Sequence, residues 1–190
     1  SLALEGRPEA AYDPDAFTQV LAMLTGGWPN HWLGWPYPPF FILLVMPLAV
    51  LPYSWAWMAW LSATAALLLA MLWSTPGLRR HAVLVFAAPA SFACIIKGQN
   101  GFLSAALLTG ALVLLDKRPR LAGICLGLLA FKPHFGLVLP VLLAVTRRWT
   151  VFLSAAATVA VCIAASVLAF GGEIWPLFIR SASGATAGWM

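Results

Sequence analysis

One short stretch of the chain, Lys97 to Gly101 (KGQNG), joins a cation, two amides and two glycines between two long apolar runs. An ionisable side chain in hydrocarbon is unfavourable unless it meets water or a partner, so such a group in a membrane helix predicts function. The Lys97 ammonium suits a phosphate, which it binds as a point charge. The amides of Gln99 and Asn100 can donate to and accept from hydroxyl groups. The stretch therefore predicts a polar site where two membrane-embedded helices join.

A second polar break, Lys132-Pro133-His134, also lies between two apolar runs. Pro133 has no backbone N–H and breaks the helix, which leaves carbonyl groups without partners. Lys132 adds a second ammonium, and His134 adds a titratable ring. Two cations on one side of a membrane suit a lipid-linked phosphate or pyrophosphate. In the alternative interpretation, both breaks are helix turns whose lysines extend to the membrane interface.

Two further candidates come earlier in the chain. Tyr37 belongs to a proline-rich aromatic segment, WPYPP, whose rings can either stack on a sugar or prenyl chain or anchor the chain at the interface. Asp13 can act as a base or hydroxyl acceptor, or it can cap a helix predicted over 15–25. The usual nucleotide-binding, zinc-protease and serine-hydrolase motifs are not found in the sequence.

The composition shows what kind of protein must position these groups. Of the 190 residues, 62% are hydrophobic and only 9% are charged, whereas soluble domains have about 25% charged residues. The chain is therefore predicted to be an integral membrane protein. Its net charge of +5 comes from cations in short loops, which indicates membrane topology and not nucleic-acid binding. The three cysteines lie in apolar runs, so we expect small buried side chains and no disulfide or metal site.

Run length predicts the helices, because about 20 residues are needed to cross a bilayer. The runs 53–73 and 151–170 are long enough to span. The run 39–51 is too short and contains Pro47, so we expect a re-entrant or partly inserted helix. The arms of two hairpins are predicted at 83–96, 102–115, 121–131 and 135–145.

The loop cations predict orientation through the positive-inside rule. Seven of the eleven cations lie at 79–80, 117–120 and 147–148, which we place in the cytoplasm. Both polar tips and both end regions then face outward. The predicted organisation is an outer loop region over 1–38, a transmembrane region over 39–170 and an outer polar loop over 171–190. Because the sequence begins with Ser1, we expect it to be an incomplete chain.

Several short motifs occur in an order that resembles glycosyltransferase family 87, a group of polyprenol-phosphate-mannose-dependent mannosyltransferases within the C-type glycosyltransferases. The motifs are Leu4-Glu5-Gly6-Arg7-Pro8, Tyr12-Asp13-Pro14, Tyr37-Pro38-Pro39, the 47–52 stretch, Gly98-Gln99-Asn100, Arg118-Pro119-Arg120-Leu121-Ala122-Gly123, Lys132-Pro133 and Arg147-Arg148-Trp149. Each is short, and their specificity comes from the series.

The resemblance implies an all-α, polytopic transmembrane bundle with short hairpin or re-entrant helices in a bacterial plasma membrane. It implies transfer of a hexose, mannose above all, from a polyprenyl-phosphate donor to a lipid or glycan acceptor at the outer face. We expect no cofactor beside this donor substrate, and metal dependence stays open. Its acidic catalytic motif precedes the segment that begins here at Leu4, so the expected base lies upstream of Ser1 and Asp13 is a weak substitute.

Residue chemistry assigns the remaining roles. We expect Lys97, Lys132 and His134 to hold the donor phosphate, with Gln99, Asn100 and Tyr37 contacting the sugar or donor. Two alternatives stay open. Paired broken helices also occur in transporters, here a transporter or flippase for a lipid-linked or anionic substrate. A non-catalytic membrane scaffold would also contain such turns.

Overall fold

The structure is a computed structural model that describes residues 2–27 and 35–183, and these residues form helices without any strand. The chain divides into two compact units. The first contains Ser1–Tyr53 and Cys162–Met190, and the second contains Ser54–Val161.

The second unit consists of helices of very different length. In chain order they are α3 (Tyr53–Trp73), α4 (Pro76–Arg79), α5 (Ala82–Ala87), α6 (Pro89–Lys97), α7 (Gly101–Leu114), α8 (Pro119–Leu128), the short 3-10 helix η3 (Leu129–Phe131), α9 (Pro133–Val145) and α10 (Trp149–Phe170). Helix α10 continues into the first unit after Val161.

Two of the described helices, α3 with 21 residues and α10 with 22, are long and apolar enough to cross a membrane. At about 1.5 Å per residue, each is about 30 Å long, which matches the hydrocarbon core of a bilayer. Both helices expose large apolar side chains: Trp55 of α3 is 62% exposed, and Leu153 of α10 is 65% exposed. Side chains of this kind on a spanning helix suit contact with lipid. Both predicted spans are thus confirmed as helices of spanning length and composition.

The first predicted hairpin arm, 83–96, is wrong as a single helix. Helix α5 ends at Ala87, and α6 begins at Pro89. Between them, Ala88 is extended, with φ −65° and ψ 142°, because the ring of a following proline disfavours helical backbone. Pro133 breaks the second hairpin as predicted and is the first residue of α9.

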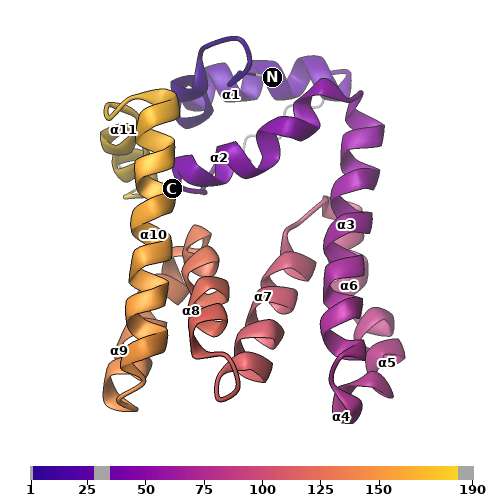
Figure 1. Cartoon of the computed structure of the whole chain (residues 1–190). Coiled ribbons are helices and arrows are strands. Elements are labelled where there is room, and N and C mark those ends of the chain that lie inside the picture. Colours follow the sequence, from indigo (N-terminus) through magenta and orange to yellow (C-terminus); the bar gives the residue numbers. More distant parts are fainter. Residues whose placement is uncertain (1, 28–34, 184–190) are drawn as a thin grey trace. The chain divides into compact units, whose positions relative to one another are not determined.

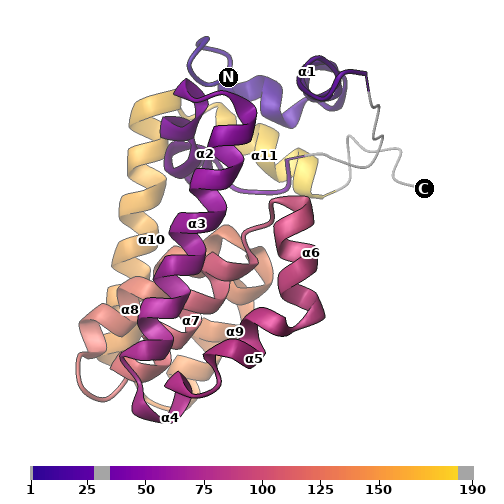
Figure 2. The same ribbon diagram turned by 90° about the vertical axis from the view of Figure 1, so that its right-hand side faces the viewer.

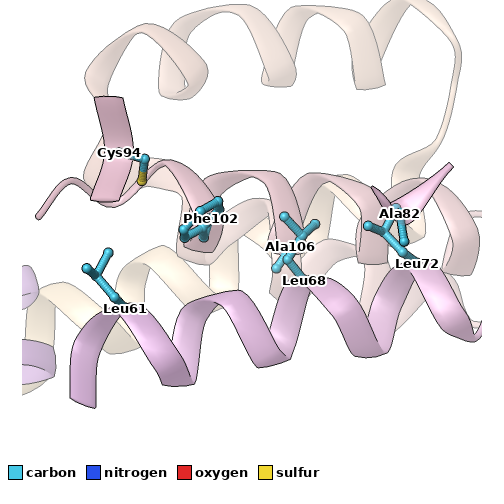
Figure 3. Packing of buried hydrophobic residues seen from close by; sticks show 7 residues of the cluster. All are labelled: Leu61, Leu68, Leu72, Ala82, Cys94, Phe102 and Ala106. Atoms are coloured by element: carbon cyan, nitrogen blue, oxygen red, sulfur yellow. The ribbon is translucent and has the colours of Figure 1, made fainter. Parts of the chain in front are cut away.

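Helix α3 packs along α5, α6 and α7 through a cluster of buried apolar side chains (Figure 3). The cluster contains Leu61, Leu68, Leu72, Ala82, Cys94, Phe102 and Ala106. Cys94 stands at the end of this cluster nearest the start of α7, beside Phe102 (Figure 3). The core of the unit therefore reaches the polar turn between α6 and α7.

Two glycines allow α8 to lie directly against α10. A Cβ atom at Gly123 would come within 2.5 Å of the Val151 carbonyl oxygen, and one at Gly127 within 2.6 Å of the Thr158 Cβ. Their spacing of four residues places both on one helix face, as in small-xxx-small packing between membrane helices. The Ser154 hydroxyl also donates to the Arg120 carbonyl at 2.7 Å. Close backbone approach thus fixes the second hairpin on α10.

The first unit consists of short helices around a small aromatic core. Its elements are the 3-10 helix η1 (Pro8–Tyr12), α1 (Pro14–Thr25), α2 (Pro39–Val45), the 3-10 helix η2 (Met46–Val50) and α11 (Ile174–Ala182). Tyr12, Ile42 and Ile174 form the buried centre of this core. The short apolar segment after Pro39 is confirmed as short, with α2 of 7 residues followed by η2 of 5.

The polar loop expected after Gly171 instead contains α11. Helix α11 buries Ile174 and packs Trp175 and Phe178 against the aromatic core, and it exposes Ile179 and Arg180. Two adjacent glycines and Glu173 favour a loop in the sequence, but the apolar residues at helical spacing find a partner surface in the folded unit.

Candidate functional site

The turn between α6 and α7 is built by a glycine in a left-handed conformation. Gly98 has φ 60° and ψ 30°, and the Gly98 N–H donates to the Ile95 carbonyl. The Gln99 N–H donates to the Cys94 carbonyl at 3.0 Å. This pair of bonds is a Schellman motif, which satisfies the last carbonyls of a helix and reverses the chain. The side chains of Lys97 and Gln99 are left exposed on the turn.

Residues of α3 and α6 pack against this turn. A Cβ atom at Gly98 would lie 2.9 Å from Cδ1 of Trp57 on α3. The Cys94 thiol donates to the Gln99 carbonyl at 3.0 Å, and a Cβ at Gly101 would lie 3.1 Å from the Cys94 sulfur. Neither Trp57 nor Cys94 was predicted to shape the site. In the sequence both look like ordinary apolar residues, and only the glycines beside them hint at a close approach.

Asn100 stands at the N-terminus of α7 and is 5% exposed. Its backbone carbonyl accepts from both the Ser104 N–H and the Ser104 hydroxyl, each at 3.0 Å. Its side chain makes no capping hydrogen bond. The first N–H groups of a helix have no partner within that helix and carry partial positive charge. The start of α7 therefore adds to the positive potential that Lys97 creates.

The second tip, Lys132 to His134, belongs to the same unit as the first. Helix η3, which precedes Lys132, contacts α7. Lys132 itself is half-buried and directly follows η3. His134 is exposed, with its ring 4.6 Å from that of Phe135. The structure thus packs the helix that precedes Lys132 against α7, the helix that follows the turn with Lys97.

The loops with most of the cations lie at the other end of this unit. Figure 1 shows α4, the α7–α8 turn and the α9–α10 turn at one end, and the views in Figures 1 and 2 agree. Arg148 forms an ion pair with Asp116, which joins the last two of these turns. Because α8 leaves this end and α9 returns to it, the junction that contains Lys132 lies at the opposite end.

Tyr37 belongs to the first unit and is part of its aromatic core. The Tyr12 hydroxyl donates to the Tyr37 carbonyl at 2.8 Å. The Tyr37 ring lies 5.2 Å from that of Trp35 and 4.8 Å from that of Phe41. Burial raises the pKa of Tyr12 well above its ordinary range, and the nearby Trp35 indole opposes this. Tyr12 therefore stays a neutral hydrogen-bond donor that fixes the backbone of Tyr37.

Asp13, also in the first unit, caps α1. Its Oδ1 atom accepts from the N–H groups of Asp15 at 2.9 Å and Ala16 at 3.1 Å. Helix α1 runs over Pro14–Thr25, so the capping role is confirmed and the helix begins one residue earlier than predicted. A catalytic role for Asp13 stays a prediction. Within residues 2–27 and 35–183, no group of three or more His, Cys, Asp or Glu residues is placed to hold a metal ion.

The sequence profile of glycosyltransferase family 87 matches residues 35–188 of the chain. This range includes both polar tips, Tyr37 and both helices of spanning length. No curated protein and no solved structure matches the chain. The family match covers most of the sequence, and it agrees with the resemblance of the ordered short motifs. The chain belongs to glycosyltransferase family 87 and is a membrane glycosyltransferase.

Proposed function

We propose that the chain is part of a polytopic enzyme that transfers a hexose, mannose above all, from a polyprenyl-phosphate donor to a lipid or glycan acceptor. The reaction takes place at the outer face of a bacterial plasma membrane. One observation carries the proposal for the donor: two helix breaks bring a lysine each to the same end of the second unit, with η3 packed on α7.

The chemistry explains why two cations are needed. Breaking the bond between the anomeric carbon and the polyprenyl phosphate leaves negative charge on the phosphate. Groups already positioned where this charge develops lower the barrier. Lys97 and Lys132 supply two such charges, and His134 assists on the same tip as Lys132. Ammonium–phosphate contacts are charge-assisted hydrogen bonds, which are about twice as strong as neutral ones.

Neutral groups then orient the sugar. Gln99 on the exposed turn and Asn100 at the start of α7 contribute amide donors and acceptors for the sugar hydroxyls. The Tyr37 ring packs against the donor. The acceptor hydroxyl needs a general base. Asp13 is the weaker candidate for this role, because the capping of α1 already engages one of its carboxylate oxygens.

The test replaces each lysine by methionine in the full-length enzyme, which keeps the length of the side chain and removes its charge. Membranes that contain the enzyme are incubated with a labelled polyprenyl-phosphate hexose, and labelled glycolipid is measured. Lys97→Met and Lys132→Met are each expected to reduce transfer on the order of 10- to 100-fold. Lys117→Met is the control, because Lys117 is an exposed cation in the α7–α8 turn at the other end of the unit.

Normal transfer in both lysine variants contradicts the phosphate site. Movement of labelled donor across the membrane without covalent transfer contradicts the proposed reaction and supports a flippase.

A further inference from the structure

An open cavity of about 540 Å³ lies within the first unit, where η1, the start of α1 and α11 meet. Its lining residues come from the 7–16 segment, together with Leu177 of α11. This volume falls in the range of sites that bind small molecules, about 300–1,000 Å³. None of the roles assigned above uses this cavity as a binding site, although Asp13 is one of its lining residues.

Three charged side chains line the cavity, namely Arg7, Glu9 and Asp13. All three are exposed. The other contributions include Pro14 and Leu177, which are apolar. A few polar groups among apolar ones is the usual composition of a site that recognises a specific small molecule.

The structure fixes the position of one of the carboxylates. The hydrogen bonds that Asp13 accepts in capping α1 all go to Oδ1. Within the described part of the chain, no residue donates a hydrogen bond to Oδ2. One oxygen therefore holds the side chain in place, and the other remains available to a ligand. Positioning of this kind reduces the entropy lost on binding.

The cavity wall is held by aromatic packing. Tyr12 lines the cavity, and its ring lies 5.7 Å from that of Phe178 on α11, in an edge-to-face arrangement. Its hydroxyl is engaged by the Tyr37 carbonyl at 2.8 Å. The cavity is thus built on the same hydrogen bond that fixes the backbone of Tyr37.

The charged side chains that line the cavity indicate which class of ligand fits it. Two carboxylates against one guanidinium disfavour an anion. A bound divalent cation usually needs more oxygen ligands than two carboxylates provide. A neutral polyhydroxylated ring fits best, since its hydroxyls donate to the carboxylates and accept from the guanidinium. Its C–H face can pack on the apolar side chains.

We propose that this cavity binds a carbohydrate headgroup of the acceptor. This inference rests on the proposed glycosyl transfer and specifies the class of acceptor that the enzyme uses.

The test is photo-crosslinking of the full-length protein in lipid nanodiscs, without sugar-based detergent. The probe is a methyl hexopyranoside that carries a diazirine, and labelled peptides are identified by mass spectrometry. We expect label within the 7–16 segment, displaced by excess methyl hexopyranoside. Glu9→Gln and Arg7→Met should each reduce it on the order of tenfold. Asp15→Asn is the matched control, because Asp15 is an exposed acid in the first turn of α1 and does not line the cavity.

Equal labelling in the wild type and Glu9→Gln overturns the proposal, as does label confined to other segments. Displacement by ethanolamine but not by the hexopyranoside also overturns it and assigns the cavity to a cationic headgroup. The transfer assay separates this result from the proposed function. If the wild type transfers no sugar, the proposed function fails whatever the labelling shows. If transfer is normal and the cavity is unlabelled, only the acceptor site fails.

Discussion

The indole ring of Trp57 lies against Gly98, so closely that a Cβ atom at Gly98 would come within 2.9 Å of the ring. This contact joins a helix of membrane-spanning length, α3, to the turn that carries Lys97. Gly98 is needed there for two separate reasons, its positive φ and the absence of a side chain.

Gly98→Ala is therefore expected to destabilise the protein, since the left-handed conformation costs about 1–2 kcal/mol for a residue with a Cβ. The contact with Trp57 adds a steric penalty. Thermal unfolding of the purified full-length protein measures the sum. Gly171→Ala is the control, because Gly171 also has a positive φ, of 82°, but a Cβ atom added there would meet nothing within 4 Å. Equal destabilisation by the two substitutions would show that the Trp57 contact contributes nothing.

Cys94 is expected to position the turn through its hydrogen bond to the Gln99 carbonyl. Cys94→Ala removes this donor and should raise the KM for the donor substrate several-fold, since the turn carries Lys97. Cys94→Ser keeps a donor and should restore part of the loss. Steady-state kinetics with the labelled donor measure both. The control is Cys125→Ala, because Cys125 is a half-buried cysteine on α8 and not part of the α6–α7 turn. A serine variant as impaired as the alanine variant would indicate packing and not the hydrogen bond.

Gly123→Ala and Gly127→Ala should each push α8 away from α10. The added methyl group would meet backbone and side-chain atoms of α10 at 2.5–2.7 Å. Overpacking of this kind costs about 1–3 kcal/mol. Gly136→Ala in α9 is the control, because a Cβ atom added at Gly136 would meet nothing within 4 Å. We expect a lower melting temperature for the first two variants and no decrease for the control. A melting temperature that stays unchanged in all three would contradict close α8–α10 packing.

The predicted membrane orientation places Gln99 outside the cell and Lys117 in the cytoplasm, and both side chains are exposed. In a full-length protein without its native cysteines, Gln99→Cys should react with a membrane-impermeant maleimide added to intact cells. Lys117→Cys should react only after the membrane is permeabilised. The reason is that the cation-rich loops stay in the cytoplasm. The reverse labelling pattern would place the proposed active site at the inner face.

The sequence predicted the helices where one local signal was strong. Run length identified α3 and α10, because a bilayer sets the length of a spanning helix. Pro133 and the glycines of the 97–101 stretch indicated both helix breaks, because proline restricts the backbone and glycine allows it conformations closed to other residues. The division at Ala88 and helix α11 were missed. Pro89 lies inside a continuous apolar run whose composition suggests one uninterrupted helix, and α11 depends on a surface supplied by distant residues.

The sequence by itself determined that this is a helical membrane protein with two cationic tips, since apolar run length and the cost of burying a charge act locally. It also singled out all the polar candidates of the proposed donor site. Only the tertiary structure decided that Trp57 of α3 shapes that site, and that Asp13 lines a cavity together with Leu177 of α11. The physical reason is that such roles depend on close contacts between residues far apart in the chain, which no local pattern records.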